Sequence, residues 1–552
     1  MSDEPQVADH DASGVRRRVW VAAALAGAAV IGLGAWRLTA SGPSDGAASV
    51  PRFVDESSAA GVQHRYEGGF DFFVGGGVAA FDCDADALPE LYFAGGTAPA
   101  ALYRNASTVG GALRFVRESS PVTDLNDVTG AYPIDIDSDD VVDLVVLRNG
   151  AGNEVLRGLG DCRFEAADDR FGIDAGEEWT AAFSATWTGA DELPTLAFGN
   201  YLRDGTTECA PSQLLRPSGG GYSAPVPFQT HCTLSILFSD WSRTGGRDLR
   251  VANDRHYYVD GGEQLWRIEP DVAPILYTED DGWRPLRIWG MGIASQDLTG
   301  DGRPEVYLTS QGDNKLQTLD DGVVAPAYHD IALDRGVTAQ RPVTGGDVLP
   351  STAWHPQFED VNNDGFTDLF VTKGNVEAQP DYASRDPNDL LIGQADGTFV
   401  PGGEDAGIIR FERSRGAAVT DLNLDGLLDV VVVNREADAE LWRNVGGGDA
   451  DRPVAMGHWL AVGLHQPAPN VDAVGAWIEV RADGITTSRE VTIGGGHAGG
   501  QLGWTHVGLG EATTAEVRVR WPDGEVGRWM EVDADRYVTI DRAADAAVEL
   551  GR

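Results

Sequence analysis

Acidic side chains recur at a fixed spacing in a short loop that occurs five times along the chain. The first copy, Phe81–Phe93, places Asp82, Asp84, Asp86 and Glu90 at loop positions one, three, five and nine and then continues into an apolar run. Hard cations such as Ca2+ take six to eight oxygen ligands, and alternate carboxylates on one tight loop can converge on such an ion. An EF-hand would instead need a glutamate at position twelve and a following helix. The spacing therefore predicts a strand–loop–strand metal hairpin.

The other four copies keep this pattern, and each is followed by an apolar run. Their predicted ligands are Asp135, Asp137, Asp139 and Asp143; Asp297, Asp301 and Glu305; Asp360, Asn362, Asp364 and Asp368; and Asp421, Asn423, Asp425 and Asp429. Thr299 holds the third position of the copy at Asp297, so we expect weaker binding or a water ligand there. Solvated acidic turns are the alternative interpretation, but they give no reason for the same spacing five times over.

Two decayed copies fill the gap between the good ones. The copy at Trp187 keeps only Asp191 and is expected to be metal-free, and the copy at Asp240 keeps only its outer acids, so its occupancy is left open. Clustered like charges are costly without a cation, so we expect the ion in the five good loops to lock each hairpin structurally rather than to act in catalysis.

The spacing of all seven loops predicts the fold. They begin at residues 82, 135, 187, 240, 297, 360 and 421, so the period is 52 to 63 residues. Each period has room for about four short strands, which predicts an all-β fold with a seven-bladed β-propeller over residues 51–447. An aromatic strand, Arg52–Val54, precedes the first loop and has no counterpart after the last. We therefore expect it to complete the seventh blade with residues 417–445, which leaves no free sheet edge.

Composition limits the class of partner. The chain has 552 residues, a formal net charge of −44 and 70 glycines, which suits a turn-rich β protein and argues against a nucleic-acid phosphate groove. No Gly-x-Ser-x-Gly or other nucleophile motif is found, so no catalytic residue is predicted.

The N-terminus predicts export. Residues 1–18 end in three arginines and are followed by the apolar stretch 19–36, whose eighteen residues reach about 27 Å as a helix, just enough to span a bilayer. The positive cluster places residues 1–18 in the cytoplasm and everything after the linker 37–50 outside. We expect a single-pass cell-envelope protein that meets the membrane only through this helix. A cleaved export signal, and hence secretion, is the alternative.

Four cysteines lie in the exported part. Three pairings are possible, and Cys209 with Cys232, which flank a Pro/Gly/Ser-rich insertion, is the favoured one, leaving Cys83 with Cys162. Free buried thiols are the alternative.

Residues 456–543 form a second β-rich module of small β-sandwich-like character, followed by a tail at 544–552. Alternating strands are predicted at 458–464, 474–481, 488–493, 515–521 and 537–540. His458, His497 and His506 lack metal-ligand spacing and are taken as turn and packing residues. The run Gly494–Gly500 could cradle an anion, but no Lys-Ser/Thr follows it, so a flexible hairpin is predicted.

A resemblance to known families supports this interpretation of the two parts of the chain. The loops resemble the FG-GAP/VCBS repeats of integrin-α-like propellers over residues 51–447. The C-terminal module is similar to the ASPIC/UnbV domain of the cartilage acidic protein family. The matching phrases of the module are 458–460, 470–476, 494–496, 506–510 and 521–524, with Val507 in place of a more usual Phe. The resemblance implies a secreted or surface Ca2+-binding protein and no defined reaction.

These features predict a Ca2+-binding propeller that recognises an extracellular protein or glycan, rather than an enzyme. The surface loops around 203–230, 253–263 and 341–352 are the expected recognition elements. Two alternatives stay open. One is an extracellular hydrolase or lyase that acts on polymers or lipids at a propeller face, and the other is a purely architectural role in an envelope complex.

Overall fold

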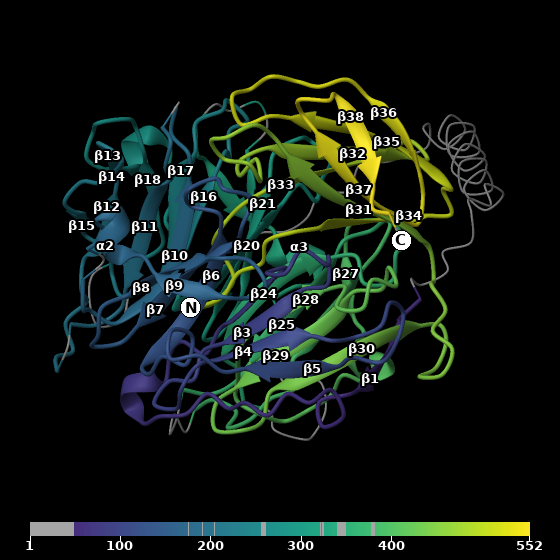
Figure 1. Cartoon of the computed structure of the whole chain (residues 1–552), viewed down its shortest axis with the longest axis horizontal. Coiled ribbons are helices and arrows are strands. Elements are labelled where there is room, and N and C mark those ends of the chain that lie inside the picture. The colour runs from purple at the N-terminus through teal and green to yellow at the C-terminus, as the bar shows by residue number, and fades with distance from the viewer. Residues whose placement is uncertain are drawn as a thin grey trace, which may run out of the picture. The chain divides into compact units, whose positions relative to one another are not determined.

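The computed structural model describes residues 49–551 apart from residues 175, 190, 204, 255–260, 321, 323–324, 339–348 and 377–380. The described chain is built from β-strands (Figure 1), and its helices are single turns: η1 (Phe70–Phe72), α2 (Asp168–Phe171), η2 (Glu279–Asp281), α3 (Ala332–Arg335) and α4 (Gly403–Ala406). The predicted all-β class is confirmed. The predicted span at 19–36 and the tail at 1–18 lie outside the described residues. Among the described helices, none has the length and apolar character needed to cross a bilayer.

Seven antiparallel four-stranded sheets follow one another along the described chain. The first is β2 (Val78–Phe81), β3 (Glu90–Phe93), β4 (Ala101–Asn105) and β5 (Phe115–Glu118), and the second is β6 (Val128–Ile134), β7 (Asp143–Arg148), β8 (Glu154–Gly158) and β9 (Phe164–Ala166). The third is β10 (Thr180–Thr186), β11 (Thr195–Asn200), β12 (Ser212–Leu215) and β15 (Val226–Phe228), with a hairpin of β13 (Pro217–Ser218) and β14 (Gly221–Tyr222) inserted.

The fourth sheet is β16 (Thr233–Ser239), β17 (Asp248–Asn253), β18 (Gln264–Arg267) and β19 (Ile275–Leu276), and the fifth is β20 (Gly290–Gln296), β21 (Glu305–Ser310), β22 (Lys315–Leu319) and β23 (Tyr328–Asp330). The sixth is β24 (Ala353–Glu359), β25 (Asp368–Lys373), β26 (Asp389–Gly393) and β27 (Phe399–Pro401), and the seventh is β28 (Ser414–Thr420), β29 (Asp429–Asn434), β30 (Glu440–Gly446) and β1 (Arg52–Asp55). The seven loops predicted from the sequence each join the first strand of a sheet to its second.

The seventh sheet joins the two ends of this array. Strand β1 pairs antiparallel with β30, with Phe53 opposite Asn444. The predicted pairing of the aromatic strand near Phe53 with the segment 417–445 is therefore confirmed. The outer edge of the last sheet is formed by the earliest strand of the chain.

The first strands of the sheets lie side by side in a closed series. Strand β2 contacts β6, which contacts β10, and the series continues through β16, β20, β24 and β28 back to β2. Side chains on these strands are almost all buried, whereas in the fourth strands, such as β5, most residues are exposed or half-buried. The arrangement is propeller-like, with the most buried strands at the centre.

The C-terminal module, residues 458–549, consists of two further four-stranded sheets around a shared apolar core. One has the order β34 (Thr505–Gly510), β31 (His458–His465), β37 (Arg536–Asp541), β38 (Ala546–Glu549), and the other has the order β33 (Ile485–Glu490), β32 (Trp477–Ala482), β35 (Thr514–Arg520), β36 (Met530–Asp533). The predicted tail at 544–552 differs from expectation, because β38 pairs with β37.

Residues 491–503, hereafter the glycine segment, leave the module and enter the centre of the seven sheets. In Figure 1 this yellow segment runs among the strands labelled β6, β20 and β24. Single bridges join it to five first strands, through the pairs Ile493–Ala185, Gly494–Leu237, Gly496–Ile293, Gly499–Ala131 and Gln501–Ala80. The prediction of a flexible hairpin at 494–500 is wrong, because Gly494, Gly496 and Gly499 of this run are bridged to the first strands of three sheets.

Candidate metal sites

All five acidic loops share one backbone conformation. Their fourth and sixth residues have positive φ angles, for example 61° at Asn363 and 89° at Gly365, a conformation that glycine and asparagine adopt most readily. The first-position carboxylate lies inside the resulting turn. At Asp360 it accepts hydrogen bonds from the backbone N–H groups of Asp364 (3.2 Å) and Gly365 (2.8 Å). Each loop is thus folded around its first carboxylate.

The ninth-position carboxylate closes the loop at the start of the second strand. Asp368 accepts hydrogen bonds from the backbone N–H of Val361 (2.9 Å) and of Gly393 (2.8 Å). Asp143 and Asp429 make the equivalent pairs of bonds, and all three side chains are buried. The outer two predicted ligands of each loop are therefore held rigidly by the backbone.

The predicted ligands come together most clearly in the first two loops. One oxygen from each member lies within 4.8 Å of the others in two groups: Asp82, Asp84 and Asp86, and Asp135, Asp137 and Asp143. In the loops at 360–368 and 421–429, the third-position amide contacts the fifth-position carboxylate, at 2.9 Å between Asn362 Nδ2 and Asp364 Oδ2 and at 3.2 Å between Asn423 and Asp425. Every group that these residues offer as a metal ligand is a carboxylate or a side-chain amide.

In the loop at Asp297, neighbouring protein groups contact two of the predicted ligands. The hydroxyl groups of Thr299 and Thr318 donate to Glu305, at 3.3 and 2.7 Å. Asp301 pairs with Arg303 at 3.3 Å. Neighbouring protein groups therefore already occupy some of the oxygen lone pairs with which these carboxylates could bind a metal ion.

The raised pKa values of the loop carboxyl groups favour the binding of a positive charge. Burial raises the pKa of Glu90 and of Asp143 to about 8, and burial together with nearby carboxylates raises the pKa of Asp425 to about 7. The pKa of Asp360 and that of Asp368 lie well above the ordinary range, again chiefly through burial. A bound cation would allow these groups to ionise at neutral pH.

Two buried carboxylate oxygens of the first two loops show whether the loop residues fit a metal ion. Asp84 Oδ1 and Asp137 Oδ1 are buried acceptors without a hydrogen-bond donor. Their other oxygens pair with arginines, at 2.8 Å to Arg104 and 2.9 Å to Arg157. A hard cation bound by oxygen ligands would occupy the free acceptors, so the donor set fits Ca2+.

In the decayed copy at 240–248, protein groups satisfy the ninth-position carboxylate. Its ninth-position carboxylate, Asp248, accepts hydrogen bonds from the Trp241 indole N–H and from the Tyr277 hydroxyl, both at 2.8 Å. Its first position, Asp240, still accepts the N–H groups of its own turn. Hydrogen bonds from uncharged groups therefore maintain the shape of this loop.

In the copy at 187–195 the first position is the buried Trp187, which offers no oxygen ligand. Asp191 accepts a hydrogen bond from the Thr188 hydroxyl at 3.0 Å. At loop positions one, three, five and nine, this copy offers a single carboxylate, that of Asp191, and that carboxylate already has a partner.

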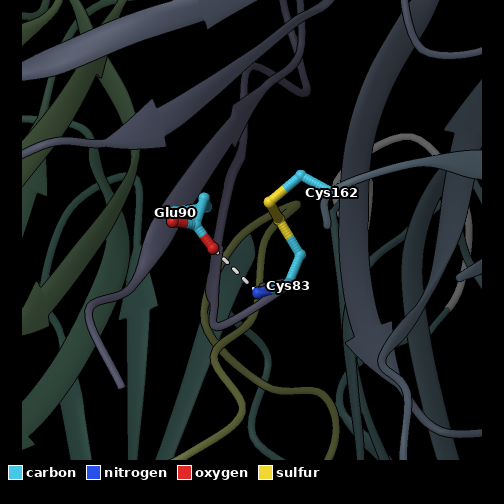
Figure 2. A group of neighbouring side chains, drawn as sticks. All are labelled: Cys83, Glu90 and Cys162. Atoms are coloured by element: carbon cyan, nitrogen blue, oxygen red, sulfur yellow. Dashed lines mark hydrogen bonds between the residues drawn. A yellow bond between two sulfur atoms is a disulfide. The ribbon is translucent and has the colours of Figure 1, made fainter. Parts of the chain in front are cut away.

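Two disulfides tie the sheets together. Cys83, the second residue of the first loop, is bonded to Cys162 of the second sheet, and Cys209 is bonded to Cys232. This is the pairing favoured from the sequence. Figure 2 shows Glu90 beside the first disulfide, where it accepts the Cys83 N–H at 2.8 Å. Since the two sulfurs are bonded to each other, this group offers no thiolate ligand.

The C-terminal module covers the end of the sheets at which the loops lie. The Tyr537 hydroxyl donates a short hydrogen bond to Asp421 Oδ2. The ring of Trp459 lies so close to Gly426 that a side chain at that glycine would overlap it. His506 Nε2 is 2.7 Å from Asn363 Oδ1. The acidic loops 360–368 and 421–429 are therefore in direct contact with the module. The loop 135–143 contacts it as well, because the N–H of Asn470 donates to the Ser138 hydroxyl at 2.9 Å.

Further contacts extend this interface around the ring. Arg489 binds both Glu359 oxygens, at 2.6 and 3.0 Å. Glu490 accepts the Ser239 hydroxyl at 2.6 Å and the Asp240 N–H at 2.9 Å. These bonds join the module to the fourth and sixth sheets.

Several glycines of the glycine segment are required by the narrow channel that it fills. A Cβ at Gly496 would lie 2.5 Å from His355 Cε1, and one at Gly500 would lie 2.8 Å from the Tyr132 ring. The N–H of Gly495 donates to Ile236 O at 2.8 Å. Only a backbone without side chains can approach the first strands this closely.

The three histidines of the module that the sequence analysis singled out have separate partners. His458 Nδ1 lies 2.8 Å from Asp535, His506 contacts the loop at 360–368 as described, and His497 Nε2 accepts the N–H of Gly75 at 3.2 Å inside the channel. Burial lowers the pKa of His497 to about 3, so its imidazole is neutral. The packing role expected for these residues agrees with their positions.

A cavity of about 680 Å3 lies between the module and the loop ends of the sheets. It is lined by the first two loops, by the glycine segment and by the charged residues Glu359, Asp472, Arg489 and Glu490. Nothing in the sequence signalled this cavity, because its walls come from segments as far apart in the chain as Ala80 and Thr539.

Comparison with known proteins finds two stretches of the chain that match family models. Residues 360–432 match the FG-GAP-like repeat, and residues 466–547 match the family described as ASPIC and UnbV. The chain thus combines an FG-GAP-like repeat with an ASPIC and UnbV domain, and the resemblance predicted from the sequence is confirmed. Among curated proteins it is similar to cartilage acidic protein 1 of Mus musculus, with 29% identity over 161 residues, and of Homo sapiens, with 28%. The match covers 26% of this chain and 21% of each relative.

Similar solved structures include the complex of BBS1N with ARL6DN soaked with lead, at 12% identity and a TM-score of 0.42, covering 74% of this chain and 100% of that chain. Another is an Agrocybe aegerita lectin that recognises non-reducing terminal N-acetylglucosamine, at 15% identity and a TM-score of 0.36, covering 64% of this chain and 88% of that one.

Proposed function

We propose that this protein is an exported, calcium-binding, seven-bladed β-propeller that recognises another protein or a glycan. The observation that carries the proposal is the set of five loops of one shape, each with buried, backbone-held carboxylates and no thiolate or imidazole ligand. In each loop, the residues at positions one, three, five and nine would hold the ion. Calcium supplies a divalent positive charge at each of these clusters.

The role proposed for the ion is structural. The outer carboxylates are fixed by backbone N–H groups at both ends of the loop, so an ion between them would clamp the hairpin that joins the first and second strands. No open coordination position facing a substrate is needed for this role. Stabilisation follows mass action, at about 2.7 kcal/mol for each site when free Ca2+ is about 100 times its Kd.

Recognition is proposed at the end of the sheets opposite the loops, because the module covers the loop end. The connections between second and third strands lie at that opposite end. Among them is the segment 201–211, tied by the Cys209–Cys232 disulfide. Parts of the predicted recognition loops 203–230, 253–263 and 341–352 lie outside the described residues.

A hydrolase or lyase is the less favoured function. His355, His497 and Arg415 do meet at the centre of the sheets, but all three are buried and the glycine segment seals them. The Arg415 guanidinium donates to backbone carbonyls, including Phe73 O at 2.8 Å. These groups support the packing of the channel.

Export and membrane anchoring rest on the N-terminal sequence alone, with its arginines before the apolar stretch 19–36. An extracellular location would supply the millimolar calcium that weaker oxygen sites require.

Calcium titration of the purified 552-residue chain by calorimetry, with melting curves in Ca2+ and in EDTA, tests the proposal. We expect several ions to bind and the Tm to rise. Asp364→Ala and Asp425→Ala should each lose about one ion, because each removes a fifth-position ligand. Asp334→Ala, at an exposed acid in α3, is the matched control and should lose none. No binding heat and an unchanged Tm would refute the metal assignment.

A further inference from the structure

The module rests on the carboxylates that would hold the ions. The Tyr537 hydroxyl is bonded to Asp421, the first-position residue of its loop. At the neighbouring loop, Asp360 Oδ2 lies where a Cβ of Gly508 would be, so the backbone of β34 is in contact with that first-position carboxylate. Both carboxylates are buried under the module.

The contacts also depend on the loop conformation. His506 is bonded to Asn363, whose φ is positive, and the N–H of Gly510 donates to Asn363 O at 3.0 Å. A loop that changed its turn would lose both bonds. The module therefore fits the loops only in the shape that brings their ligands together.

The glycine segment moves with the module. It follows β33, which ends at Glu490, and it leads into β34, which begins at Thr505. Since both of its ends return to the same module, it is inserted from one end of the channel without threading a chain terminus. Separation of the module from the loops would withdraw it.

We infer that ions bound at the loops 360–368 and 421–429 control the docking of the C-terminal module and, through it, the filling of the central channel. This inference rests on the proposed calcium sites. Without ions, the carboxyl groups of each loop are clustered and buried beneath the docked module with no positive charge to balance them. With ions, the charge is balanced and the first-position carboxylates stay where Tyr537 and Gly508 meet them. By linkage, the docked module must in turn strengthen ion binding.

Undocking would expose a surface that can bind a peptide backbone. In the closed state the channel walls accept N–H groups of the glycine segment at Ile236 O (2.8 Å) and Ile293 O (2.7 Å). With the segment withdrawn, these carbonyls would be available to an extended, glycine-rich chain, as in strand addition to a sheet edge. Calcium would thereby select between a closed and an open channel.

Hydrogen exchange of the 552-residue chain, with Ca2+ and with EDTA, tests the inference. We expect peptides from the glycine segment to exchange about tenfold faster or more in EDTA, while strands of the seven sheets keep their protection. Tyr537→Phe should raise the calcium concentration needed to protect the segment. Tyr103→Phe is the matched control, since its hydroxyl donates at 2.9 Å to Gln63 O and does not contact the module.

The outcomes separate the inference from the proposed function. If calorimetry detects no calcium binding, both fail. If calcium binds but the exchange of the segment is the same in EDTA, the inference alone is overturned. It is also overturned if EDTA removes protection from the segment and the sheets together, because calcium would then act on the whole fold.

Discussion

Replacing Gly496 by alanine asks whether the glycine segment is a packed part of the protein. Gly496 has a φ of +54°, and an added Cβ would lie 2.5 Å from His355 Cε1. His355 is buried, and its Nδ1 accepts the His497 N–H at 3.1 Å. The ring therefore cannot move away without losing a buried hydrogen bond.

Three effects contribute to the loss of stability expected for Gly496→Ala. An alanine in the left-handed region costs about 1–2 kcal/mol, overpacking costs about 1–3 kcal/mol and the lost hydrogen bond costs about 1 kcal/mol. Together, the free energy of unfolding should fall by roughly 3–6 kcal/mol. Gly219→Ala is the matched control, because Gly219 has a φ of +62° and nothing within 4 Å of an added Cβ. It should lose only the backbone part, about 1–2 kcal/mol.

Urea unfolding of the two variants and the parent, followed by circular dichroism and tryptophan fluorescence in excess Ca2+, measures the difference. The reasoning is refuted if Gly496→Ala is no less stable than Gly219→Ala, since the segment would then have room in the channel and would not be packed against His355.

Three further predictions concern pH, the disulfide and the loops. In excess Ca2+, the free energy of unfolding should fall as the pH drops from 6.5 to about 4, because burial lowers the pKa of His355 from 6.5 to about 4 and the unfolded chain therefore takes up the proton first. This residue accounts for up to about 3 kcal/mol, and urea unfolding at a series of pH values would show a flat profile if the idea were wrong. The double Cys→Ser variant at Cys83–Cys162 should lose about 3–4 kcal/mol, since that bond closes a long loop; equal melting of the variant and of the parent under non-reducing conditions would contradict this. Asp368→Asn should lower the number of Ca2+ bound in calorimetry by about one, whereas Asp248→Asn should leave it unchanged, because indole and phenol donors already satisfy Asp248; a loss of one ion in both variants would refute this assignment.

Local chemistry made the sheets predictable. Each acidic loop carries its own turn signal and is followed at once by an apolar strand, so the seven loop positions locate the first and second strands of every sheet. The pairing of Phe53 with the last sheet could also be predicted, because one aromatic strand preceded the first loop and one was lacking after the last. In both cases the signal lies within a few residues of the feature.

The centre of the molecule could not be predicted in this way. Gly496 must be glycine because of His355, which is 141 residues away and on another sheet. A glycine run without hydrophobic periodicity looks flexible when only its neighbours in sequence are considered. The docking of Tyr537 on Asp421 is equally non-local. At the decayed loop, the lost acids were visible in the sequence, but the replacement donors Trp241 and Tyr277 needed the fold to be seen.

The pairing of β1 with β30 has a consequence for the order of folding. The seventh sheet joins residues 52–55 to residues 442–446, so the circle of sheets cannot close until the ribosome has made residue 446. Until then, the earliest strand is an unpaired edge, open to wrong partners. Such a long sequence separation also predicts slow closure. The strand β1 is therefore a natural site for a chaperone to protect until β30 has been made.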